Sequence, residues 1–336
     1  MKRTWLVLGI LLTPTAVTGQ GQPSRLATTI AAGSVFRPGA SGPIPIPDLR
    51  VVLHRVGRAT QGPIDTTRTD GAGRFRFRFA ADTTANFLLS ANYAGIEYFS
   101  QPLATNPARP DTAVELLVYD TTSVDPVGTR SRTLVIGAPD AIGARTVVDW
   151  LVLANDGERT RVGADSTDPT WGLPLPAGVR NPALGDARLS QISPDAVLFR
   201  NDSVFVLAPL SPGDKELLLQ YEIAPRTRRL AVDLRGIDST DAFIEESGAR
   251  IEGDGWRVRD SQLFEGRPFR RLGRTDSTVT SLTIRFPSTG AGPATLPILV
   301  GLTAVALMIG TWLRMRRPPA APAGKGSGLA PRSPPS

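Results

Sequence analysis

The stretch TRTDGAGRFRFRF, residues 67–79, carries the clearest pattern in the chain and decides the predicted fold class. Its second half alternates aromatic rings with guanidinium groups: Phe75, Phe77 and Phe79 against Arg74, Arg76 and Arg78. A period of two puts the rings on one face of a strand and the arginines on the other. Asp70-Gly71 just before it is a strong turn signal. The stretch therefore predicts a half-buried β-strand that follows a tight turn.

Short apolar runs separated by turn residues continue on both sides of this stretch. In the segment 25–126 they predict further strands over 49–54, 87–93 and 114–119. In the segment 132–288 they predict strands over 133–136, 146–154, 196–199, 204–207, 216–223, 230–234, 257–264 and 279–286. No amphipathic helix competes with these strands. The sequence therefore predicts an all-β protein with two β-sandwich domains, prealbumin-like or immunoglobulin-like.

The N-terminus has the order of a secretory signal. Lys2 and Arg3 precede a short apolar run over 5–12, and small and polar residues follow as far as Gly19. This order predicts a signal peptide over 1–19 that is cleaved after Gly19. An uncleaved anchor is the alternative, but the apolar run is short for a membrane-spanning helix.

A longer apolar run near the C-terminus predicts one transmembrane helix over 294–313. No charged side chain lies between Arg285 and Arg314, so the run can cross about 30 Å of hydrocarbon as a helix. Basic residues after the run resist translocation, which places the tail over 314–336 in the cytoplasm and the β-domains outside it. The tail is basic and proline-rich, so we expect it to be disordered. The anchor residues are Leu296, Trp312, Leu313, Arg314, Arg316 and Arg317.

The net charge of +7 belongs to the two ends of the chain. Between Gln20 and Leu313 the sequence has 31 basic and 31 acidic residues, so a general surface for nucleic acid is not expected. Cysteine is absent and His54 is the one histidine, which excludes thiolate chemistry, cysteine-ligated clusters and histidine-rich zinc sites. The fold has to rest on core burial without disulfides.

No pattern of residues predicts catalysis or a bound metal. The sequence has no G-x-S-x-G, Walker A or HExxH motif. Glu245 and Glu246 are neighbours, but adjacent residues of a strand point to opposite faces, and His54 is expected on an exposed strand face. Four further carboxylates lack the ordered spacing of a calcium loop: Asp156, Glu158, Asp165 and Asp168. We therefore expect a protein that is not an enzyme and that has no cofactor.

Five short motifs in the first segment resemble one known family: Gly33-Ser34-Val35, the proline-rich run 43–47, Val51-x-Leu53, Thr69-Asp70-x-x-Gly73-x-Phe75-x-Phe77 and Tyr93-x-Gly95-x-x-Tyr98. Together they resemble the bacterial carboxypeptidase regulatory-like domain. The resemblance implies a prealbumin-like β-sandwich that acts as an accessory or binding module and contributes no catalytic residue. It also implies a protein of the bacterial cell envelope, with its domains in the periplasm if the cell is diderm. The same fold is similar to certain carbohydrate-binding modules.

Aromatic residues are candidates for glycan binding, because sugar sites use exposed rings as platforms. The candidates in the first segment are Tyr93, Tyr98 and Phe99, and core packing is the alternative, since buried rings dominate small β-cores. In the second segment Trp171 lies in the stretch 168–182, which we expect to be the longest irregular loop. Long loops on a rigid sandwich favour binding, but Trp171 can equally close one end of the sandwich.

Arg74, Arg76 and Arg78 are the candidates for a charged contact. They can grip phosphate, carboxylate or an acidic partner strand, or they can form a solvated face that discourages aggregation. The leading hypothesis is a non-catalytic, single-pass membrane protein that binds a protein partner as an accessory or scaffold of an envelope assembly. A carbohydrate or cell-wall binding module is the alternative. A hydrolase is the third hypothesis and rests on the family's name alone.

Overall fold

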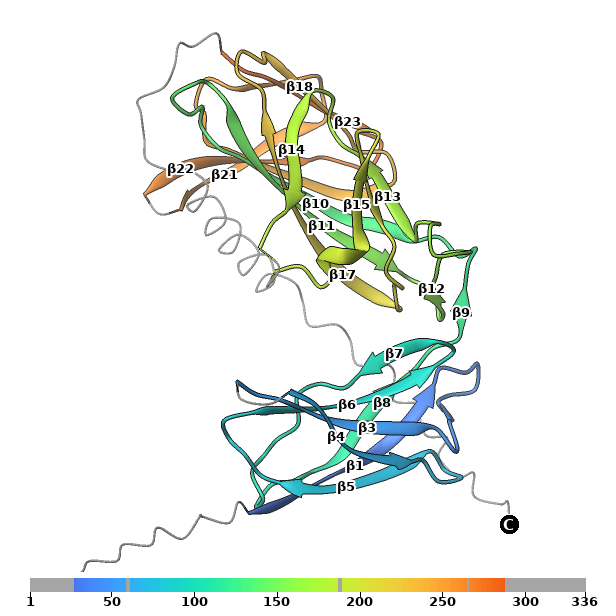
Figure 1. Cartoon of the computed structure of the whole chain (residues 1–336). Coiled ribbons are helices and arrows are strands. Elements are labelled where there is room, and N and C mark those ends of the chain that lie inside the picture. Colours follow the sequence, from blue (N-terminus) through green and yellow to red (C-terminus); the bar gives the residue numbers. More distant parts are fainter. Residues whose placement is uncertain (1–26, 59–60, 187–188, 265, 288–336) are drawn as a thin grey trace, which may run out of the picture. The chain divides into compact units, whose positions relative to one another are not determined.

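The structure is a computed structural model, and it describes residues 27–58, 61–186, 189–264 and 266–287 (Figure 1). Within these ranges the chain consists of β-strands, turns and irregular connections, with one 3-10 helix at Pro194–Ala196. The prediction of an all-β fold is therefore confirmed for the part of the chain that the structure describes.

The two ends of the chain fall outside this part. They comprise the predicted signal peptide over 1–19, the transmembrane helix over 294–313 and the tail over 314–336. Among the described residues, no helix has the length and the apolar character needed to cross a membrane. Contacts divide the chain into two compact units, Met1–Val118 and Tyr119–Ser336. Each unit has its own set of sheets.

Two sheets build the first unit. One has β1 (Thr28–Arg37) in contact with β2 (Ile44–Pro45) and β5 (Arg74–Ala80), both antiparallel, and with β8 (Asp111–Leu117), which is parallel. The other has the antiparallel order β4 (Gln61–Arg68), β3 (Arg50–Val56), β6 (Asn86–Tyr93) and β7 (Ile96–Phe99). β5 is therefore a terminal strand of its sheet.

The alternation along β5 fills the core of the first unit. Phe75, Phe77 and Phe79 are buried and the arginines between them are exposed, as the sequence predicts. The centroid of the Phe79 ring lies 4.8 Å from that of Phe87 on β6, so side chains of the two sheets meet in one core. This packing is consistent with a β-sandwich.

Two local features fix the position of β1 and the start of β5. Gly33 lies at an irregularity between β1 and β8, where an added Cβ atom would be 1.9 Å from the carbonyl oxygen of Val114. Glycine is required there, because any larger residue forces the backbones apart. Before β5, Asp70 closes the predicted turn, and its Oδ1 accepts a hydrogen bond from the backbone N–H of Arg74 at 2.8 Å. Gly73 adopts the positive φ of +73° that this turn needs.

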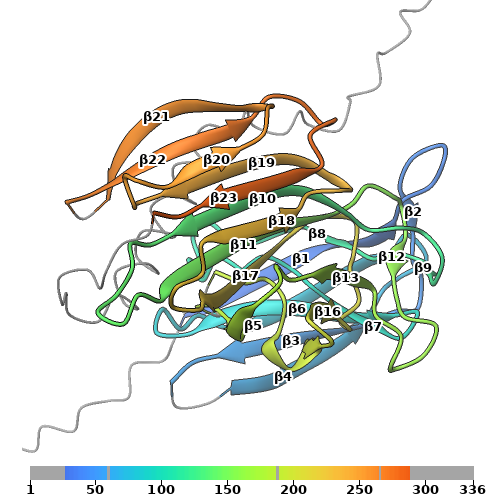
Figure 2. The ribbon, with the colours of Figure 1, turned by 90° about the horizontal axis from the view of Figure 1, so that it is seen from above.

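A seven-stranded sheet forms the centre of the second unit. Its order is β14 (Val179–Leu184), β17 (Gly213–Ile223), β11 (Arg145–Asn155), β10 (Gly128–Ile136), β19 (Ile237–Ile244), β22 (Arg267–Arg274) and β21 (Trp256–Phe264). Figure 2 shows β10, β11 and β17 running side by side through the middle of this unit.

Three smaller sheets complete the second unit. The first has the order β13 (Trp171–Pro174), β16 (Ser203–Val206) and β15 (Val197–Arg200), and the second β18 (Arg229–Asp233), β23 (Ser281–Arg285) and β20 (Arg250–Glu252). A short parallel pair joins β9 (Thr121–Thr122) and β12 (Thr160–Arg161).

Apolar side chains cover both faces of the seven-stranded sheet. In one cluster, Leu151 of β11 packs with Val204 of β16 and Ile284 of β23, so the two three-stranded sheets contribute to this core. In a second cluster, Val148 of β11 packs with Phe269 of β22. A strand buried on both faces has a nearly continuous apolar sequence, which is what β11 shows.

The prediction of one long loop over 168–182 is wrong. The stretch contains β13 and the start of β14, each of which is terminal in its sheet. Proline lacks a backbone donor and is tolerated at a sheet edge, so Pro174 and Pro182 do not prevent strand formation here. The strands β19 and β22 were not predicted either, because their charged residues interrupt the apolar alternation.

Candidate functional site

Arg74, Arg76 and Arg78 form a row on the outer face of β5, here called the arginine ladder. All three side chains are exposed, and alternate residues of a strand are about 6.6 Å apart. Within the described residues, none of these guanidinium groups has a hydrogen bond or an ion pair. By contrast, Arg55 of β3 donates to Asp82 at 2.5 Å. The ladder therefore presents three charges that the unit does not neutralise locally.

The neighbouring strand leaves the ladder accessible. The register places Ser34, Ala32 and Ile30 of β1 opposite Arg74, Arg76 and Arg78, respectively. Serine and alanine are too short to cover a guanidinium group, and neither carries a charge that could pair with it. The residues opposite Arg74 and Arg76 are thus short, Ile30 is the larger neighbour of Arg78, and Glu115 of β8 lies on the same face one strand further away, in register with Ser34.

In the same unit, the carboxylate of Asp82 is paired with an arginine. Hydrogen bonds from the Arg55 guanidinium and from the Thr84 hydroxyl and N–H lower the pKa of Asp82 from 3.8 to about 2. These two side chains are charged at neutral pH and satisfy each other. The arginines of the ladder have no such partner among the described residues.

The aromatic candidates of the first unit do not form an exposed platform. Tyr98 is 7% exposed and Tyr93 is half-buried, so Tyr98 follows the core-packing alternative. Phe99 is 59% exposed, and its ring centroid lies 6.1 Å from that of His54. His54 is half-buried rather than fully exposed, and its Nε2 lies 2.8 Å from Ser90 Oγ. A single exposed ring next to a histidine is a small surface for a sugar.

Trp171 is also buried. It is 7% exposed, belongs to the larger apolar cluster of the second unit, and donates its Nε1–H to Thr129 Oγ1 at 3.2 Å. Its ring is therefore not available to a ligand. The burial of Trp171 is compatible with the other interpretation, in which the ring closes one end of the sandwich.

A buried charged triad lies in the seven-stranded sheet. The Arg132 Nη2 donates to Asp149 Oδ2 at 2.6 Å, and the Tyr221 hydroxyl donates to the same oxygen at 3.1 Å. Arg132 and Asp149 are 0% exposed and Tyr221 is 1% exposed. Sequence analysis missed this triad, although one signal was present: Asp149 interrupts the otherwise apolar run over 147–154.

The surroundings keep the phenol of Tyr221 and the guanidinium of Arg132 protonated. Burial raises the pKa of Tyr221 and the charge of Asp149 raises it further, so the phenol stays protonated. Burial disfavours the charge of Arg132, but Asp149 and Tyr221 together outweigh this effect, and the pKa of Arg132 lies above its usual value. Because the three side chains are enclosed, they join β10, β11 and β17 and do not reach a substrate.

Glu245 and Glu246 pair with different arginines. Glu245 Oε1 accepts from Arg267 Nε at 2.7 Å, and Glu246 Oε2 accepts from Arg145 Nε at 2.7 Å. Both residues follow the end of β19, so strand alternation does not apply to them, but their carboxylates point to different arginines. Each carboxylate thus has its own structural partner, and the two do not form a catalytic pair.

Three of the four carboxylates considered for calcium, Asp156, Asp165 and Asp168, interact within turns or with arginine. Asp165 Oδ1 accepts from the N–H and the hydroxyl of Thr167, and Asp156 pairs with Arg130. In the ranges that the structure describes, no group of three or more His, Asp or Glu residues could hold a metal ion.

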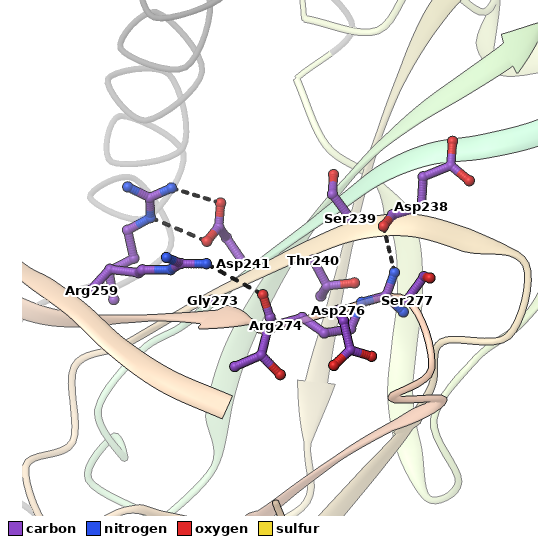
Figure 3. Close-up of a pocket in the computed structure, with 11 residues that line it drawn as sticks. Asp238, Ser239, Thr240, Asp241, Arg259, Gly273, Arg274, Asp276 and Ser277 are labelled. Carbon is purple, nitrogen blue, oxygen red and sulfur yellow. Dashed lines mark hydrogen bonds and ion pairs between the residues drawn. The ribbon is translucent and has the colours of Figure 1, made fainter. Parts of the chain in front are cut away.

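A polar cavity of about 310 Å³ lies next to β19, β21 and β22 (Figure 3). Arg271 in its wall pairs with Asp241 at 2.9 Å, and Arg274 Nη2 donates to the Asp238 carbonyl at 2.6 Å. Arg259 lies in the wall as well, and its Nη2 donates to the Arg274 carbonyl at 3.4 Å. The charged groups of this cavity therefore interact mainly with the protein itself.

Comparisons with known proteins provide no family. No protein-family model matches the chain, and a search of curated proteins finds no match. The resemblance of the first segment to the carboxypeptidase regulatory-like domain stays a prediction. Among the described residues, the arginine ladder brings three charged groups without a hydrogen-bond or ion-pair partner together on one strand face.

Proposed function

We propose that this chain is a non-catalytic, membrane-anchored protein of the bacterial cell envelope that binds an acidic protein partner through the arginine ladder. The first 19 residues direct export, the apolar run over 294–313 anchors the chain, and the two units lie outside the cytoplasm. Both units are β-sandwiches in this proposal, the first of them prealbumin-like. The protein acts as an accessory or scaffold subunit.

One observation carries the proposal: three exposed guanidinium groups share one strand face and lack a partner among the described residues. Guanidinium groups form strong, charge-assisted hydrogen bonds with carboxylates. The three phenylalanines on the reverse side of β5 are buried, so the strand is held in place before a partner arrives. A preorganised surface loses little conformational entropy on binding.

The glycan alternative has less support. Two of its aromatic candidates, Tyr98 and Trp171, are buried in the cores of their units. The ladder offers charge and no ring, which favours an acidic ligand over a neutral sugar.

In-membrane crosslinking of the full chain, followed by mass spectrometry, tests the proposal. The test variant reverses the ladder with Arg74→Glu, Arg76→Glu and Arg78→Glu. The matched control makes the same charge change at three exposed arginines elsewhere in the first unit: Arg50→Glu, Arg58→Glu and Arg109→Glu.

We expect one defined envelope protein to crosslink to the wild type and to the control, and to be lost from the ladder variant. Equal recovery of the partner from all three chains would refute the ladder as its binding site. Recovery of glycan without protein would favour the carbohydrate-binding alternative.

A further inference from the structure

The terminal position of β5 has a consequence for its backbone. In the first sheet β5 pairs with β1 on one side only. The N–H of Val35 donates to the Gly73 carbonyl at 2.8 Å, and the N–H of Ala81 donates to the Ala27 carbonyl at 2.7 Å. In an antiparallel ladder the residues that bond to the neighbour alternate with residues whose backbone groups point the other way. Odd-numbered residues of β5 therefore bond to β1.

The even-numbered residues, which are the arginines of the ladder, direct their N–H and C=O groups to the open edge. Arg74 confirms this assignment, because its carbonyl accepts from the Asp70 N–H at 2.9 Å and its N–H donates to Asp70 Oδ1. For Arg76 and Arg78 no backbone partner occurs within the described residues. The same two residues thus present a free backbone edge and an unpaired guanidinium group.

We propose that this edge binds its partner by strand addition, and that the partner segment is an extended strand with acidic residues alternating with apolar ones. The inference rests on the proposed function and specifies how the ladder is used. A strand added beside β5 places every second side chain on the ladder face, with Cβ atoms about 5 Å from those of the arginines opposite. Acidic residues fit these positions. The residues between them lie on the face of Phe75, Phe77 and Phe79, where apolar side chains fit.

The simplest other strand that could pair with this edge is β5 of a second copy of the chain, and its charge excludes it. Pairing β5 with itself puts arginines of one chain beside arginines of the other, and like charges at directly opposite positions destabilise a strand pair. The edge is therefore protected against self-association and remains open to a strand of opposite charge. Exposed arginines on the edge thus select the partner and do not merely block pairing.

Amide-resolved hydrogen exchange on the full chain tests the proposal with a defined probe. The probe is a capped peptide of alternating valine and glutamate, with the 7 residues of β5. In the free chain, we expect the amides of Arg76 and Arg78 to exchange fast and that of Phe77 to exchange slowly. Saturating peptide should slow exchange at Arg76 and Arg78 by at least about tenfold, the effect expected for new backbone hydrogen bonds. Unchanged exchange at both amides overturns the proposal.

A peptide control separates strand addition from charge attraction without altering the protein. N-methylation of alternate peptide residues removes the N–H groups on one edge of the probe, and methylation of the remaining residues removes those on the other. Strand addition predicts that methylation of the probe edge that faces β5 abolishes binding, whereas methylation of the opposite edge does not. Equal binding of the two methylated peptides contradicts it.

Substitution at Arg76 separates this inference from the proposed function. Arg76→Pro removes the edge N–H, which does not bond to β1, and Arg76→Thr removes the guanidinium group equally but keeps the N–H. We expect the natural partner to bind the proline variant about tenfold more weakly than the threonine variant. If the two variants bind alike while the triple glutamate variant loses the partner, the ladder acts through side chains alone: strand addition is then wrong and the proposed function stands.

Discussion

Removing the carboxylate of the buried triad should destabilise the second unit strongly. Asp149→Asn keeps the shape of the side chain but removes the carboxylate charge that the Arg132 guanidinium, which is 0% exposed, bonds to. Breaking a buried ion pair by removing one partner costs about 3–5 kcal/mol. For a unit of this size, such a loss lowers Tm by about 6–20 °C. Tyr221→Phe removes one hydrogen bond to the same carboxylate and should cost about 1.5–3 kcal/mol.

Thermal and urea unfolding followed by tryptophan fluorescence measure this effect. Trp150, Trp171 and Trp256 belong to the second unit, so a change in their fluorescence on unfolding reports on that unit. The matched control is Asp156→Asn, which removes the same group from an ion pair with Arg130 at the surface and should cost less than about 1 kcal/mol. If Asp149→Asn unfolds within about 1 kcal/mol of the wild type, the triad does not hold the sheet together.

Three further predictions concern stability. Gly33→Ala should destabilise the first unit by at least about 2 kcal/mol, because its Cβ would be 1.9 Å from a carbonyl oxygen, whereas Gly71→Ala, with open space around it, should be nearly neutral in urea unfolding. Trp171→Ala should cost about 3–5 kcal/mol through the cavity that it leaves, and a loss below about 1 kcal/mol would place the ring outside the core. The pKa of Asp82 is about 2 when folded and 3.8 when unfolded, so its bond to Arg55 stabilises the unit above pH 4. This stability should disappear as the pH falls from about 4 to 2, and Asp82→Asn should remove that part of the pH dependence.

Sequence analysis identifies those parts of the fold that repeat a local pattern. The alternation in β5 is visible because each arginine has a buried phenylalanine as its neighbour, and the apolar run of β11 is visible because both faces of that strand are covered. The stretch 168–182 was predicted to be a loop, although its prolines lie in terminal strands, which tolerate them.

Contacts between distant residues were beyond the reach of local patterns. Arg132 and Asp149 meet across neighbouring strands, and Tyr221 joins them from a strand that is 72 residues away from Asp149 in the sequence. Asp149 in an apolar run signals a buried charge, but its partner can be any of many arginines. The same limitation applies to Trp171, whose burial depends on strands that lie far apart in the chain.

The net charge gives no indication of the arginine ladder, because it is a sum over the whole chain. The segment between the ends is neutral, and from that balance a solvated and inert ladder is the natural expectation. The structure gives a reason against this expectation, because many of the carboxylates are already paired with other arginines. The pairs are Asp82 with Arg55, Asp149 with Arg132, Glu246 with Arg145 and Glu245 with Arg267.

Acidic residues that pair elsewhere cannot also neutralise β5. Three guanidinium groups therefore keep their charge on one face of a terminal strand, beside two backbone positions with free hydrogen-bonding groups. Side-chain charge and an open backbone edge coincide at Arg76 and Arg78, and an extended acidic strand is the kind of ligand that uses both. In the proposed function the binding surface is determined by the local pairing of charges, and not by their sum over the chain.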